Sequence, residues 1–104
     1  MRGPLAAAPI LVAAMTGSTA GMAATVVVTV KDLAFAPARV AAKVGDTVEW
    51  RNADFLDHTA TATDGTFDVV IPAGKNASWV VSRPGPYNYL CTYHPNMTGV
   101  IAAE

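Results

Sequence analysis

Beyond residue 24, short apolar stretches recur about every ten residues, and residues that favour turns separate them. Within these stretches apolar and polar side chains alternate, as in Thr47-Val48-Glu49-Trp50-Arg51, where Val48 and Trp50 face one side. No stretch has the period of a helix. The pattern predicts an all-β sandwich or barrel of antiparallel strands. The predicted strands cover residues 25–30, 39–43, 47–52, 59–63, 67–71, 77–83, 87–91 and 99–103.

Glycine, proline and aspartate mark the predicted turns. Gly45-Asp46 and Asp64-Gly65 supply a positive φ or a side-chain cap. Pro72-Ala73-Gly74 and Pro84-Gly85-Pro86 are expected to end strands, because proline cannot donate a hydrogen bond to a ladder. These turns divide the chain into about eight strands.

The period of two also predicts which side chains point inward. It places Cys91 on the same face as Tyr87 and Tyr89, so the thiol is expected to point inward at the end of its strand. The residues expected in the core are Val48, Trp50, Trp79, Tyr87 and Tyr89.

The first residues differ in character from the rest. Arg2 precedes an apolar run over residues 5–15, and small residues follow as far as Ala23 and Ala24. This order is typical of a secretory signal peptide. A membrane helix is the alternative, but a run of 11 residues interrupted by Pro9 falls short of the roughly 20 needed to span a bilayer. We expect cleavage after Ala23 or Ala24.

The predicted organisation is therefore a signal peptide over residues 1–23 and one domain over residues 24–104. Lys and Arg number 7 against 8 Asp and Glu, so no basic field exists to bind nucleic acid. The only cysteine is Cys91, which rules out an internal disulfide. A lone thiol in an exported, periplasmic domain calls for another explanation.

The segment Cys91-Thr92-Tyr93-His94-Pro95-Asn96-Met97 supplies that explanation. It places a thiolate, an imidazole and a thioether three residues apart, and Pro95 favours a loop that curls back on itself. The remaining histidine is His58. Taken singly, each of these residues is ordinary: a hydrogen-bonded histidine, a buried cysteine or a methionine in the core.

Taken together, they form a donor set for copper. Thioether is a poor ligand for zinc, whereas a His₂Cys plane with a weak axial methionine is the arrangement of blue-copper electron-transfer sites. The predicted metal ligands are His58, Cys91, His94 and Met97. They would hold one copper ion that cycles between Cu(I) and Cu(II), and the protein would not be an enzyme.

The sequence resembles the cupredoxins, and within them the amicyanin-like group. Three features carry the resemblance: the Cys-x-x-His-x-x-Met spacing of residues 91–97, Trp50-x-Asn52 ahead of His58, and the closing Gly99-Val100-Ile101. It extends over nearly all of the chain after residue 23. Tyr93 and Asp57 stand where the group often has proline, and the segment from His58 to Cys91 is several residues short.

The resemblance implies a Greek-key β-sandwich and a monomeric electron carrier. It implies a type 1 copper site and transient redox partners, a dehydrogenase or a c-type cytochrome. Hydrogen bonds from Asn52, Thr59 and Thr92 would tie the ligand segments together, and a backbone N–H near Thr59 would reach the sulfur. Electrons would pass through His94, beside an apolar rim that includes Phe55 and Leu56.

Features of the sequence also fit three other classes of protein in part. Tyr89-Leu90-Cys91 resembles part of an immunoglobulin-like domain, but the bridge of that fold needs a second cysteine. Cys91 and His94 could serve an enzyme as nucleophile and base, yet the sequence contains no recognisable oxyanion-binding motif. A periplasmic copper carrier or storage protein would use similar soft ligands, and this alternative stays open.

Overall fold

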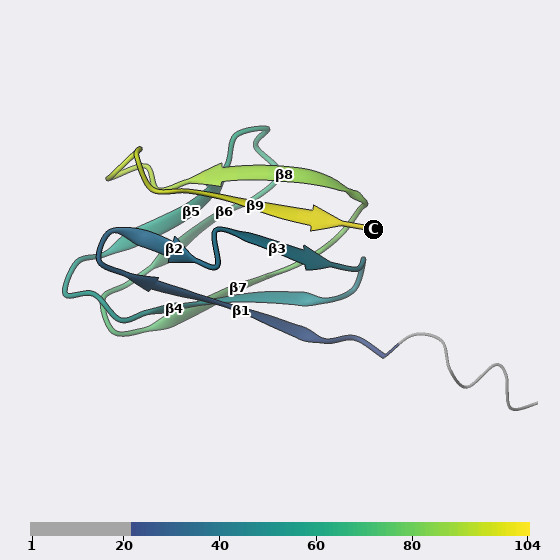
Figure 1. The fold of residues 1–104 in the computed structure, drawn as a ribbon, viewed down its shortest axis with the longest axis horizontal. Helices are drawn as coiled ribbons and strands as arrows, with labels where there is room; N and C mark the ends of the chain where they lie inside the picture. Colours follow the sequence, from purple (N-terminus) through teal and green to yellow (C-terminus); the bar gives the residue numbers. More distant parts are fainter. Residues whose placement is uncertain (1–21) are drawn as a thin grey trace, which may run out of the picture.

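A computed structural model describes residues 22–104, and that part of the chain contains nine strands and no helix (Figure 1). The expected all-β class is confirmed. No helix long and apolar enough to cross a membrane occurs within these residues. The strands are β1 (Thr25–Lys31), β2 (Ala34–Ala36), β3 (Arg39–Ala42), β4 (Thr47–Asn52), β5 (His58–Ala62), β6 (Asp68–Ile71), β7 (Asn76–Val80), β8 (Gly85–Leu90) and β9 (Thr98–Ala103).

The strands form two sheets that pack face to face as a sandwich (Figure 1). One sheet has the order β2-β1-β4-β7 and the other the order β3-β9-β8-β5-β6. The expected purely antiparallel pairing is wrong, because β1 pairs with β4 and β3 pairs with β9 in parallel. These partners are not consecutive in the chain: two strands separate β1 from β4, and five separate β3 from β9. The chain therefore has room to return before it pairs.

The sequence did not predict β2. Its three residues follow a tight turn at Asp32 and Leu33, whose φ angles are 53° and 58°. Glycine is the residue that most often adopts such angles, so the sequence Asp32-Leu33 does not indicate a hairpin turn. The carboxylate of Asp54 accepts hydrogen bonds from both backbone amides, at 2.8 and 3.3 Å. Asp54, which is 21 and 22 positions away from these two residues in the chain, thus stabilises the turn.

A second expectation also fails, because Gly85 and Pro86 belong to β8 and pair with Ala103 and Ala102 of β9. The neighbouring strand β5 pairs with β8 only at its far end, through Leu90 and Tyr89. At Pro86 the strand is therefore bonded on one side alone, where a proline can be tolerated. In the other sheet, the edge strand β7 stops at Val80, three residues before the predicted boundary.

Aromatic side chains fill the space between the sheets. The Trp50 indole N–H donates a hydrogen bond to the Tyr89 hydroxyl at 3.2 Å, and both side chains are buried. Burial raises the pKa of Tyr89 to about 12, although the bond from Trp50 acts in the opposite direction. Phe35 packs edge-on against Tyr89, and Phe67 packs between Trp50 and Trp79. The expected core is confirmed, with Trp79 only partly buried.

Different connections lie at the two ends of the sandwich. Figure 1 shows the β8–β9 connection, the β4–β5 connection and the β1–β2 turn together at one end, and the C-terminus at the other. The β3–β4 turn lies at the C-terminal end as well. All of the predicted ligands belong to the first end, at residues 58 and 91–97.

Gly99 on β9 provides a test of the core. A Cβ atom there would lie 2.4 Å from the ring carbon and hydroxyl of Tyr89, which is buried and cannot withdraw. We expect Gly99→Ala to lower the free energy of unfolding by about 1–3 kcal/mol, as measured by urea denaturation. Gly85→Ala is the control, because its nearest contact would be an ordinary 3.6 Å from Tyr87. Equal stability of the two variants would contradict this packing.

Candidate metal centre

His58 is the first residue of β5 and is completely buried. The sequence placed it just before that strand. Its backbone pairs with Ile71 of β6, so the sheet fixes where the imidazole starts. The side chain therefore enters the site from the interior of the sandwich.

The 91–97 segment is a compact loop held by its own backbone. The Cys91 amide donates to the Met97 carbonyl at 3.0 Å, the His94 amide to the Cys91 carbonyl at 3.2 Å, and the Met97 amide to the His94 carbonyl at 2.9 Å. The predicted loop that curls back on itself is thus observed. Each of its three bonds joins two of the predicted ligand residues, which fixes their spacing along the loop.

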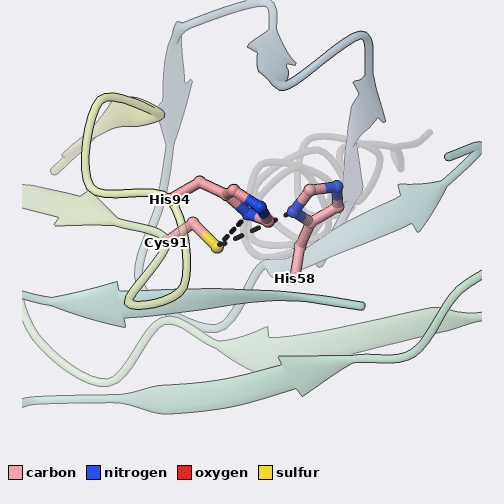
Figure 2. Close-up of side chains that lie close together, drawn as sticks. All are labelled: His58, Cys91 and His94. Atoms are coloured by element: carbon pink, nitrogen blue, oxygen red, sulfur yellow. Dashed lines mark hydrogen bonds between the residues drawn. The ribbon is translucent and has the colours of Figure 1, made fainter. Parts of the chain in front are cut away.

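Three of the predicted ligands converge. The Cys91 sulfur lies 3.7 Å from His58 Nδ1 and 3.8 Å from His94 Nδ1, and the three donor atoms lie within 4.8 Å of one another. Figure 2 shows His94 and Cys91 approaching from the loop and His58 approaching from the opposite side. The fold thus brings together side chains that are separated by 33 residues.

These separations suit a shared metal ion. With bond lengths of roughly 2.0 Å to nitrogen and 2.3 Å to sulfur, as for zinc, and angles of roughly 110–120°, a nitrogen and a sulfur donor lie about 3.5–3.7 Å apart. Within residues 22–104 no carboxylate joins this cluster. A fourth strong donor of the kind that a structural zinc site requires is therefore missing from this part of the chain.

Hydrogen bonds join the His58 segment to the Cys91 loop. The Thr59 amide donates to the Cys91 sulfur at 3.3 Å, and the Thr92 amide donates to the Thr59 hydroxyl at 2.9 Å. The hydroxyls of Thr59 and Thr92 lie 3.2 Å apart. The bonds expected of Thr59 and Thr92 are observed. The first of them stabilises negative charge on the sulfur.

Asn52 acts on the other side of the site. Its amide nitrogen donates to the carbonyls of Leu56 and Ile71, each at 2.9 Å, and its oxygen accepts from the Asp54 amide at 2.8 Å. These bonds order the loop between β4 and β5 against β6. Asn52 therefore orders the loop that leads to His58, and its side chain makes no hydrogen bond to the 91–97 loop.

Asp54 was not identified from the sequence. Its Oδ2 atom lies 2.8 Å from His58 Nε2, and a carboxylate can only accept, so Nε2 carries the proton. Nδ1, the atom that faces Cys91, then presents its lone pair to the site. Burial raises the pKa of Asp54, but hydrogen bonds from Asp32, His58 and Leu33 outweigh it and leave the pKa below its ordinary value. Its only sequence signal is its place four residues before the histidine.

Met97, the fourth predicted ligand, is buried at the end of the same loop. Its backbone is fixed by the bonds to Cys91 and His94. Its role as a ligand stays a prediction.

The two histidines differ in their access to solvent. His58 is buried, whereas His94 is partly exposed. Large apolar side chains are exposed on the connections at this end of the sandwich: Leu33, Phe55, Leu56 and Tyr93. We call these four residues the apolar rim.

Comparison with known proteins agrees with this description. Residues 4–103 match the family model of the cupredoxin-like domain. Amicyanin-alpha of Methylorubrum extorquens is 31% identical over 83 residues, which cover 74% of this chain and 70% of that protein.

Solved structures of amicyanin variants share the fold. A methionine-to-alanine variant with Cu(I) superposes with a TM-score of 0.71 at 26% identity, covering 77% of this chain and 82% of the other. A proline-to-glycine variant in its reduced Cu(I) form at pH 4 also gives 0.71, at 27% identity, with coverage of 82% and 85%. The sandwich, the ligand loop and the extent of the family match lead to one conclusion: the chain belongs to the cupredoxin-like domain family.

Proposed function

We propose that this protein is an exported blue-copper electron carrier, in which His58, Cys91 and His94 hold one copper ion and Met97 is its weak axial ligand. The convergence of two imidazole nitrogens and one thiol sulfur at separations of 3.7 and 3.8 Å carries the proposal. Bound copper would supply a one-electron Cu(II)/Cu(I) couple. The family and its amicyanin relatives support the same function.

The donor set favours copper over zinc. Thiolate and thioether are soft ligands that suit Cu(I), and imidazole suits both oxidation states. His58 and Cys91 are buried and fixed by Asp54 and Thr59, so these two ligands have little freedom to rearrange when the charge of the site changes. A site that moves little between oxidation states favours rapid electron transfer.

The exposed edge of His94 is the proposed route for electrons. It lies on the connection that carries Tyr93, and the other members of the apolar rim lie on neighbouring connections. A small exposed apolar surface suits brief docking of a redox protein. The proposed partners are a dehydrogenase and a c-type cytochrome, met in the periplasm after the signal peptide of residues 1–23 is removed. All but the last two residues of that segment lie outside the described part of the chain.

A copper carrier or storage protein remains the second candidate. It shares the soft donor set, but burial of the Cys91 sulfur and of the His58 ring opposes the ligand exchange that delivery requires. Incubation of the copper-loaded protein with a Cu(I) chelator separates the two functions. An electron carrier should keep its metal through repeated redox cycles, whereas a carrier for delivery should lose it.

Cys91→Ser tests the metal site directly. Addition of Cu(II) to the native protein should produce an intense visible band from charge transfer between the thiolate and copper. Because a serine oxygen cannot give that transition, we expect the variant to lose the band. Absorption spectroscopy measures this, and Thr92→Ser, which retains a hydroxyl at position 92, is the control. Full absorption in Cys91→Ser would rule out the proposed thiolate ligand.

Met97→Leu tests the axial position. Leucine keeps an apolar side chain of similar volume in a buried position but removes the sulfur. Loss of a weak donor should destabilise Cu(II) more than Cu(I), so we expect copper to stay bound and the reduction potential to rise. Protein-film voltammetry measures the potential. A potential equal to that of the native protein would show that Met97 is only a residue of the core.

Leu56→Lys tests the apolar rim. Electron self-exchange brings two copies together through the same surface, so a new positive charge on both should slow the reaction about tenfold at low salt. NMR line broadening in mixtures of the oxidised and reduced protein measures the rate. Val44→Lys is the control, because Val44 is similarly exposed but lies in the β3–β4 turn at the opposite end of the sandwich. An equal effect of both substitutions would contradict docking at the rim.

A further inference from the structure

Asp46 lies in the β3–β4 turn, at the end of the sandwich opposite the metal centre (Figure 1). It is one of few buried charged residues and is only 6% exposed. Its carboxylate accepts hydrogen bonds from the Ala24 amide at 2.9 Å and from the Lys43 amide at 2.8 Å. These bonds, from Ala24 first and Lys43 second, lower the pKa of Asp46, so the group stays ionised at neutral pH.

The charge of Asp46 has no cationic side chain bound to it among residues 22–104. The ion pairs of this part of the chain join Arg51 to Glu49 and His58 to Asp54. A buried carboxylate with backbone donors alone is incompletely compensated, because a neutral amide offsets less charge than a cation does. The two residues before Ala24 are exposed, with Met22 at 88%.

Ala24 is the first residue that the sandwich holds. Its carbonyl accepts from the Thr47 amide at 2.9 Å, and the ladder between β1 and β4 begins at the next residue, with Thr25 opposite Thr47. Cleavage after Ala24 would remove both this bond and the bond to Asp46. Cleavage after Ala23 would keep both.

We propose that the leader is removed after Ala23, and that the α-ammonium group so formed on Ala24 is bound by the buried carboxylate of Asp46. A signal peptidase would hydrolyse the Ala23–Ala24 peptide bond with water, leaving a carboxylate on Ala23 and a protonated amine on Ala24. The sequence agrees, because cleavage there follows Gly21-Met22-Ala23, a small-x-small pattern. Cleavage one residue later would place Met22 where a small residue is preferred.

Processing would then give Asp46 a hydrogen-bonded cation, in addition to the Lys43 ammonium, which acts on it only through space. The amide N–H already lies at 2.9 Å from Oδ1, and conversion to an ammonium strengthens that hydrogen bond without moving the chain. The exported protein would gain stability only once its leader has been removed. This inference concerns the end of the sandwich far from the metal centre, and it holds whether or not copper binds.

The pH dependence has a definite sign. A neighbouring carboxylate raises the pKa of an amine above its unfolded value, about 7.7–8.0 for an α-amino group. The added stability is therefore complete below about pH 7.7 and is lost as the pH rises through the folded value. The other charged groups at this site are the Lys43 ammonium, which opposes the effect, and the side-chain carboxylate of Glu104, which favours it.

The first experiment is export of the full chain in a Gram-negative host, followed by intact-mass measurement and N-terminal sequencing. The expected product begins at Ala24. A mature chain that begins at Thr25, or at any other residue, would overturn the proposal.

The second experiment compares urea unfolding of the exported native protein and of Asp46→Asn between pH 7 and 10. At pH 7 we expect the folding equilibrium constant of Asp46→Asn to be about two- to fivefold lower than that of the native protein. This deficit should shrink as the pH rises and the α-amine of the native protein loses its proton. Asp64→Asn is the matched control, because Asp64 also caps a turn and accepts a backbone bond, from Thr66, but lies far from Ala24 in the β5–β6 turn. Its difference from the native protein should stay constant.

A third measurement covers the case in which Asp46→Asn does not fold. Selective transamination of the N-terminus turns the α-amine of the native protein into a neutral carbonyl group. The modified protein should be less stable than the native protein at pH 7, and this deficit should be smaller at pH 10, where the native amine has lost its charge. A deficit that does not change between pH 7 and 10 in either experiment would show that no ion pair forms.

Discussion

The hydrogen bonds between the start of β5 and the ligand loop are the constraint on which the candidate site depends. Thr59 donates its amide to the Cys91 sulfur and accepts the Thr92 amide with its hydroxyl. One residue thereby fixes both the position of the thiol and the path of the loop that carries it. Because Thr59 adjoins His58 in a buried strand, the imidazole and the thiol are set by the same few atoms. These fixed positions would limit how far the candidate ligands move when the charge of a bound metal changes, which is what the proposed electron carrier requires.

The loop between β4 and β5 supports the site from the other side. Asn52 fixes this loop to β6, and Asp54 uses one carboxylate for two tasks: it orients the His58 ring and holds the β1–β2 turn. That turn contains two residues with left-handed backbone angles, whose cost is offset by the bonds to Asp54. The local structure of the turn and the orientation of the His58 ring are thus coupled. Asn52 and Asp54 also satisfy backbone groups of Leu56 and Leu33, two of the exposed apolar residues on these connections.

The two ends of the sandwich are connected by the parallel pair of β1 and β4, which runs from Thr25 opposite Thr47 to Val30 opposite Asn52. Its first residues lie next to Asp46, and its last residues lead to the loop that holds His58. Val28, Val48 and Trp50 bury the middle of this pair, so it joins the end that contains Asp46 to the end that contains the candidate metal centre. Stability and function are nevertheless separated in space, because the charged anchor and the soft-donor site lie at opposite ends of the sandwich.

The sequence alone determined most of the strand pattern, the inward side of Trp50, Tyr89 and Cys91, and the set of candidate copper ligands. Local periodicity and the chemistry of single side chains suffice for these. It could not determine the parallel pairings, strand β2, or the place of Pro86 within a strand, because each depends on which distant strand lies alongside. It also gave no sign of Asp54, since an aspartate in a loop acquires its role only when folding brings His58 Nε2 and the Asp32–Leu33 turn within reach of its carboxylate. The residue types alone identify the candidate donor atoms. The geometry of these donors, and the hydrogen bonds that fix it, depend on contacts between residues 21 to 33 positions apart in the chain, which only the tertiary structure decides.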